Sequence, residues 1–395
     1  MLLATLAATN TAPASCGLQS TPDNNPFPPR VKNRLPSCRR FFVNQAMSDE
    51  RAKGSYLYPN TSDDPDRIDV LRNKFGIQSN SELRTEEYRA TAFRMAEIAE
   101  GDGPRGNFDK EHLKAIHGYI FQDVYEWAGH TRNESPIVDG AQVEPIGGLA
   151  KGGTSFLHGS RIEFGLDEAL NPIRDPEVLR GSTPEQFAER AGQVLAELNY
   201  VHPFREGNGR AQEAFIVELG RHYGHDVDFT VISKPRMIEA SIETTNDPST
   251  PAMKHVMEDA TNSNRQQALR AAFTDLEQCG EKPFEHNIRT ARPGEEITGQ
   301  VLGHDNRVAS IVTDERIVAV DRADLPERLP DDDAEISFTA RSDFSRLGRE
   351  QQATAAQSQP EQAEQPQQDT GAEIKAYAAM AARRERERDD DDRDR

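Results

Sequence analysis

Cysteine is scarce in this chain, with three residues in 395: Cys16, Cys38 and Cys279. An odd count at wide spacing supports neither a disulfide framework nor a zinc cluster, so a reduced environment is the default. No apolar run approaches the roughly 20 residues that a membrane-spanning helix needs. We therefore expect a cytoplasmic protein with no membrane span.

Positive charge is also in short supply relative to negative charge. Asp and Glu together number 67 and Lys and Arg 47, which gives a formal net charge of −20. This balance argues against binding of the whole protein to nucleic acid or to an anionic membrane surface. Hydrophobic residues make up 35% of the chain. That share is low for a fully folded chain of this length, so part of the sequence should be tail or linker.

The composition changes along the chain, and its length favours two or three domains. The first residues are rich in Pro, Asn, Ser and Thr, and Met47 offers an alternative start. In chain order we expect a disordered extension (1–54), a helical domain (55–260), a polar and partly helical connector (261–290), a small β-module (291–340) and a disordered charged tail (341–395).

Helical periodicity is clearest in the central region. Apolar residues recur at three- and four-residue spacing over Lys110–Ala128, over Pro184–Asn199 and again over 211–219. Thr183 and Gln186 have the spacing of a capping box, and Pro184 would take the first helical position. Between the first two helices lies the glycine-rich stretch 146–156, which we expect to be a loop or hairpin.

The residues with the clearest chemistry are 202–210, His-Pro-Phe-Arg-Glu-Gly-Asn-Gly-Arg, between the second and third helical stripes. Two glycines and an asparagine at a helix start place several backbone N–H groups in one turn, which favours anion binding. Glu206 would repel a phosphate unless a cation bridges them, so it is a candidate Mg²⁺ ligand. Arg210 can pair with a phosphate, and His202 can accept a proton from a hydroxyl. Together these residues predict phosphoryl or nucleotidyl transfer.

This segment resembles the Fic family signature, His-x-Phe-x-Asp/Glu-Gly-Asn-Gly-Arg. The flanking segments YLYPN, GNFDKEHLKAIHGYIFQDVYEWAGHTR, AKGGTSF and ASIETTND are also similar to the Fic core, in the expected order. The similarity covers about residues 55–260 and is greatest to Fic domains of bacterial type IV secretion effectors and of toxin–antitoxin pairs. It implies a mainly α fold, a helical bundle with a β-hairpin flap.

The resemblance implies protein adenylylation, in which a Ser, Thr or Tyr hydroxyl of a target protein attacks the α-phosphate of ATP. His202 would be the general base, Glu206 would hold Mg²⁺, and Phe204 would anchor the turn in the core. A glycine at 209, where a lysine marks a kinase relative, favours AMP transfer. The residues expected to hold the nucleotide are Arg205, Gly207, Asn208, Gly209 and Arg210 in the turn and Lys151, Gly152 and Gly153 in the flap. The target would bind along the flap edge.

One position departs from the family pattern. A second arginine, which contacts the γ-phosphate, is expected three residues after Arg210, but the sequence has Glu213. A carboxylate there should weaken ATP binding or shift the nucleotide preference. The Ser/Thr-x-x-x-Glu-Gly/Asn inhibitory motif of the family is also missing. Inhibition would then come from a separate, small antitoxin-like protein, or Glu213 has removed the need for it.

Two alternatives to adenylylation remain open at this stage. The first keeps the fold but uses another nucleotide or phosphate-ester donor. The second is a Fic scaffold made inactive by Glu213 that acts as a binding or regulatory module. Export through a type IV secretion system is the alternative to a purely cytoplasmic location.

Overall fold

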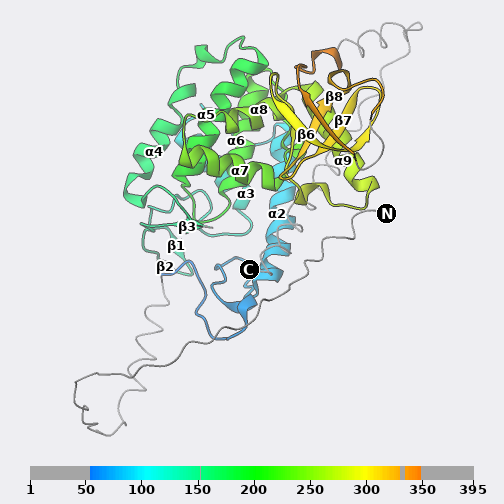
Figure 1. The fold of residues 1–395 in the computed structure, drawn as a ribbon. Helices are drawn as coiled ribbons and strands as arrows, with labels where there is room; N and C mark the ends of the chain where they lie inside the picture. The colour runs from blue at the N-terminus through cyan, green and yellow to red at the C-terminus, as the bar shows by residue number, and fades with distance from the viewer. Residues whose placement is uncertain (1–53, 152, 330–333, 348–395) are drawn as a thin grey trace, which may run out of the picture. The chain divides into compact units, whose positions relative to one another are not determined.

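The computed structural model describes residues 54–151, 153–329 and 334–347 (Figure 1). The predicted disordered segments lie almost wholly outside these residues. The helices are α2 (Asn80–Glu100), α3 (Lys110–Phe121), α4 (Ile162–Ala169), α5 (Pro184–Val201), α6 (Asn208–Tyr223), α7 (Lys234–Asn246), α8 (Ala252–Thr261) and α9 (Ser263–Gln278). Short 3₁₀ turns lie at Pro65–Arg67, Gly159–Arg161, Asn171–Ile173, Pro176–Val178, Phe229–Val231, Pro283–Glu285 and Arg322–Asp324.

The strands form two hairpins and one larger sheet. The hairpins pair β1 (Ile137–Val138) with β2 (Ala141–Gln142), and β3 (Ala150–Lys151) with β4 (Thr154–Ser155). The sheet contains β5 (Ile288–Thr290), β6 (Glu296–His304), β7 (Val308–Val312), β8 (Ile317–Asp321) and β9 (Glu335–Thr339), in the order β5-β8-β7-β6-β9. Only the β5–β8 pairing is parallel among these. The predicted mainly α fold with a hairpin flap and a small β-module is confirmed.

Helix α5 is the central element of the helical core. It begins with the predicted capping box, in which Thr183 Oγ1 accepts from the Gln186 backbone N–H while the Gln186 side chain accepts from Thr183 N. Its apolar stripe is fully buried against α4, α6 and α8. At Gly192 a Cβ atom would lie 2.9 Å from the Lys254 Cα, so glycine allows α5 and α8 to approach closely.

The expected helix over Lys110–Ala128 is shorter than predicted. Asp109 caps its start, but α3 ends at Phe121. The carbonyls of Gln122 and Val124 accept hydrogen bonds from Lys74 rather than from a further helical turn. The apolar spacing continues past the helix end because residues 124, 125 and 127 are fully buried in a turn.

The sheet has a small apolar cluster of its own, which includes Ile297 and Ile311. Strands β5, β7 and β8 also contribute to the apolar core of the helices, and α9 packs against these strands (Figure 1). Ile288 in β5 already belongs to this core, three residues before the expected start of the β-module. Phe344 and Leu347, which we assigned to the tail, are 0% and 1% exposed. Folded structure therefore extends past the expected boundary at 340, because these side chains cover apolar surface next to α9.

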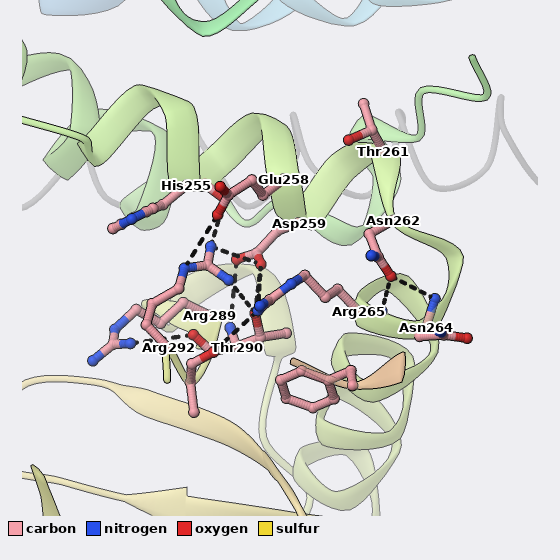
Figure 2. Close-up of polar contacts among 12 residues, drawn as sticks. His255, Glu258, Asp259, Thr261, Asn262, Asn264, Arg265, Arg289, Thr290 and Arg292 are labelled. Atoms are coloured by element: carbon pink, nitrogen blue, oxygen red, sulfur yellow. Dashed lines mark hydrogen bonds and ion pairs between the residues drawn. The ribbon is translucent and has the colours of Figure 1, made fainter. Parts of the chain in front are cut away.

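A buried ionic cluster joins α8 and α9 to β5. Asp259 is fully buried and accepts hydrogen bonds from Thr290 and from Arg292 Nη2, the latter at 2.9 Å, and Arg265 Nη1 lies 3.8 Å away (Figure 2). Burial alone would raise the pKa of Asp259, but the charges of Arg292, Arg265 and Arg236 outweigh it and lower the pKa. The carboxylate therefore stays ionised and offsets part of the positive charge around it.

Candidate active site

The predicted nucleotide-binding turn connects α5 to α6. His202 ends α5 in the left-handed region, at φ 46°, and Gly207 precedes α6 at φ 78°. A Cβ atom at Gly207 would lie 2.1 Å from the Phe121 ring, so no other residue fits there without displacing the core. At Gly209 a Cβ atom would meet nothing within 4 Å. The connection is thus closely packed at Gly207 and open to solvent at Gly209, in the first turn of α6.

Two buried side chains hold the turn in shape. Asn208 accepts from Phe204 N and donates to Phe204 O, both at 2.9 Å, which closes the loop on itself. Phe204 is fully buried, as predicted, and stacks on His117 with the ring centroids 3.8 Å apart. The Asn208 side chain therefore braces the loop, and its direct contact with a nucleotide stays a prediction.

His117 supports the turn from α3. Its Nδ1 accepts from Gly129 N at 2.9 Å, so the ring proton lies on Nε2, which donates to Glu206 O at 3.0 Å. Burial lowers the pKa of His117 to about 3. A neutral imidazole of one tautomer thus orients the peptide group that carries Glu206.

His202 is covered by the flap. Its ring stacks on Phe156 with a centroid distance of 3.8 Å and an interplanar angle of 9°. Burial lowers the pKa of His202 to about 4, although the nearby charge of Glu206 opposes the shift. The imidazole is therefore neutral near pH 7 and able to accept a proton.

Glu206 keeps its negative charge in the turn. Burial would raise its pKa, but the Gly207 N–H at 3.0 Å and the positive charges of Arg210, Lys151 and Arg205 lower it. An ionised carboxylate suits a divalent metal carried on phosphate oxygens, and the positive charges around it would attract the phosphates. Among the described residues, no three His, Cys, Asp or Glu side chains gather as a metal-binding group.

Arg210 contacts α2 through a residue that the sequence did not single out. Its Nη2 pairs with Glu87, its Nη1 donates to Thr91 Oγ1 at 3.0 Å, and its guanidinium lies 4.7 Å from the centre of the Phe121 ring. Tyr125 donates its hydroxyl to Glu87. Burial raises the pKa of Glu87, although Arg210 opposes this. In this arrangement Arg210 is engaged by a carboxylate at the place where a phosphate is expected.

The stretch 146–156 contains a β-hairpin, as expected for a flap. Lys151 in β3 is exposed, and Gly153 has a φ of 82°, where an added Cβ atom would meet nothing within 4 Å. Gly152 lies outside the described residues. Lys151 lowers the pKa values of both His202 and Glu206, so the flap and the turn act on one another electrostatically.

Comparison with known proteins agrees with this geometry. The sequence matches the Fic/DOC family over residues 107–219. It is 32% identical over 197 residues to the "Probable protein adenylyltransferase Fic" of Escherichia coli K12, which covers 49% of this chain and 87% of that protein. This chain belongs to the Fic/DOC family.

Two further Fic/DOC relatives extend the comparison. A "Protein adenylyltransferase" of Bartonella henselae is 30% identical over 250 residues, 63% of this chain and 44% of that protein. The structure of "Type IV secretion system effector protein BepA" aligns with a TM-score of 0.64 at 28% identity, over 73% of this chain and 96% of that one. The chain spans less than half the length of the Bartonella henselae relative.

Three residues of this Fic/DOC site were not predicted from the sequence: Glu87, His117 and Arg132. Glu87 had a readable signal, because it occupies a buried position four residues after Leu83 and four before Thr91 in α2. A charged residue in a buried stripe needs a partner, which indicates a polar site. The other two carry no such signal, because their partners are backbone groups far away in the sequence.

Proposed function

We propose that this protein transfers AMP from ATP to a hydroxyl group of a target protein. The observation that carries the proposal is the placement of two side chains in one turn: His202, stacked on Phe156 at the end of α5, and Glu206, two residues before α6. Burial lowers the pKa of His202, and nearby positive charges lower the pKa of Glu206, so the imidazole is neutral and the carboxylate ionised. The neutral imidazole accepts the proton of the attacking hydroxyl. The hydroxyl oxygen bonds to the α-phosphorus, and the bond from that phosphorus to pyrophosphate breaks.

The residues fit a magnesium ion that arrives with ATP. Mg²⁺ prefers one or two carboxylates together with phosphate oxygens and water, and Glu206 supplies one ionised carboxylate. When bound, the ion would neutralise charge on the phosphates. The backbone N–H groups at the start of α6 would hold phosphate oxygens. Because the His202 imidazole is neutral, it can still accept a proton.

Two residues weaken the proposed ATP site. Glu213 stands one turn beyond Arg210 in α6, and Glu87 pairs with Arg210 itself. Both carboxylates lower the attraction of this region for a triphosphate. We infer a transferase of reduced ATP affinity. A small inhibitor protein and a protein target at the edge of the flap remain part of the proposal, supported by the family membership.

Transfer from ATP labelled at the α-phosphate tests this function. The full chain is incubated with lysate proteins, Mg²⁺ and the label, and a parallel reaction carries the label at the γ-phosphate. We expect protein-bound label from the α-position alone, lost in His202→Ala and in EDTA. His304→Ala, in an exposed position at the end of β6, is the matched histidine control. Label from the γ-position would indicate a kinase, and target binding without label would indicate a scaffold.

A further inference from the structure

Arg132 is a buried arginine with an unusual set of partners. It is 0% exposed, and among the residues that the structure describes, all hydrogen-bond acceptors of its guanidinium are backbone carbonyls. A buried charge without a carboxylate is costly unless every donor is satisfied. The stability of this buried guanidinium therefore depends more on the number of its hydrogen bonds than it would for an arginine paired with a carboxylate.

On one side the guanidinium holds both ends of the flap. Nη1 donates to Ile146 O and to Gly147 O, each at 3.1 Å, ahead of β3. Nη2 donates to Leu157 O, after β4. The backbone adds a bond from Ile146 N to Arg132 O at 2.7 Å. The two chain ends of the hairpin are thus joined through one side chain.

On the other side the same residue holds the turn that carries His202. Nε donates to His202 O at 2.9 Å, and Nη2 donates to Val201 O at 3.3 Å. The Arg132 backbone N–H donates to Pro203 O at 2.7 Å. These carbonyls lie at the C-terminal end of α5, where the helix dipole favours a positive charge.

The chemistry of the side chain matches this task. A guanidinium is planar and carries five N–H donors in a fixed fork, so it can bridge three backbone segments at fixed angles. An ammonium group carries three donors on one atom and cannot reach the same set. Phe156, which stacks on the His202 ring, is next to Leu157. Loss of the flap-side bonds would therefore also loosen the cover of the imidazole.

We propose that Arg132 is a positioning residue that fixes the flap relative to the turn bearing His202, so that a hydroxyl bound along the flap meets the imidazole. The catalytic part of this inference rests on the proposed transferase function. The structural part does not, because the fork can be tested in the ligand-free chain.

Hydrogen exchange of the backbone tests the structural part. In Arg132→Ala we expect exchange to rise by about tenfold at 146–159 and 200–204, with little change in α9. Arg132→Lys, which keeps the charge, should show most of the same rise. Arg265→Ala, which removes a buried arginine beside Asp259, is the matched control and should act on α9 and β5 instead. Unchanged exchange in the flap, or an equal rise throughout the chain, would overturn the proposal.

Chemical rescue distinguishes loss of the guanidinium hydrogen bonds from a general loss of stability. Guanidinium added to Arg132→Ala at tens of millimolar should slow exchange at 146–159, whereas methylammonium should not. Equal effects of the two cations, or none from guanidinium, would count against the fork.

Kinetics then test the catalytic part. Arg132→Lys should lower kcat and raise KM for the protein that is labelled in the transfer assay, with a smaller rise in KM for ATP. An equal rise in the two KM values would contradict positioning. If the exchange results hold but even the unaltered chain transfers no label, the transferase proposal fails and the positioning of the flap stands.

Discussion

The state of the His202 imidazole can be measured directly in the ligand-free protein. The ring stacks on Phe156, and burial lowers its pKa from 6.5 to about 4. This difference corresponds to a preference of about 3 kcal/mol for the neutral form. The lowered pKa means that the base stays available as the pH falls, and is lost only as the pH approaches about 4.

The protonated fraction of the imidazole distinguishes a buried ring with a lowered pKa from a ring with the ordinary pKa. At about pH 5.5 an imidazole with the ordinary pKa is about 91% protonated, whereas one with a pKa near 4 is about 3% protonated. Replacing Phe156 by Ala removes the apolar cover, so the pKa should rise toward 6.5 and the protonated fraction at this pH should increase. The charges facing the ring are Glu206, Arg132 and Lys151, and they are left unchanged by this substitution.

Carbon-13 NMR of the histidine Cε1 groups provides the assay. The His202 signal is assigned by its loss in His202→Ala, and free imidazole in the same tube serves as the reference. We expect the signal to move little between about pH 8 and pH 5.5, while the reference titrates fully. A signal that is half shifted at pH 6 or above would refute the argument from burial. An unchanged titration in Phe156→Ala would show that the stack is not its source.

Four further changes follow from the same structure. Glu87→Gln should release Arg210 for phosphate and raise MgATP affinity by roughly tenfold in calorimetry, about 1.4 kcal/mol. Glu213→Arg should raise both ATP affinity and AMP transfer, measured with labelled ATP. Asp259→Ala removes the carboxylate partner of the buried Arg265 and should lower the free energy of unfolding in urea by about 3–5 kcal/mol. Thr183→Ala loses the cap of α5 and should cost about 1 kcal/mol in the same assay.

The first three of these changes each have a result that would contradict the reasoning. Unchanged or weaker MgATP binding in Glu87→Gln would mean that the carboxylate does not compete with phosphate. No gain from Glu213→Arg would mean that position 213 does not face the nucleotide. A loss at Asp259 no larger than that at Thr183 would mean that the ionic cluster is not critical for the packing of β5 on α8 and α9.

Local features of the chain were predictable because they depend on neighbouring residues. The capping box of α5 and the apolar stripe behind it appear as expected. The flap was foreseen as a glycine-rich hairpin, and the turn from His202 to Arg210 was recognised from its own nine residues. The end of α3 could not be predicted in this way, because it depends on Lys74, which lies almost fifty residues earlier. Lys74 donates hydrogen bonds to the carbonyls that a longer helix would use.

The fold class, the family signature and the residue types that could carry nucleotidyl transfer could all be predicted from the sequence, because they depend on local patterns of residues. The folded arrangement was needed to show that Arg210 pairs with Glu87, that His117 holds the peptide of Glu206, and that Arg132 joins the flap to the turn. Hydrogen bonds to backbone carbonyls leave no trace in side-chain pattern, because every residue carries the same acceptor. The partners of a buried polar side chain therefore become visible only when the chain has folded.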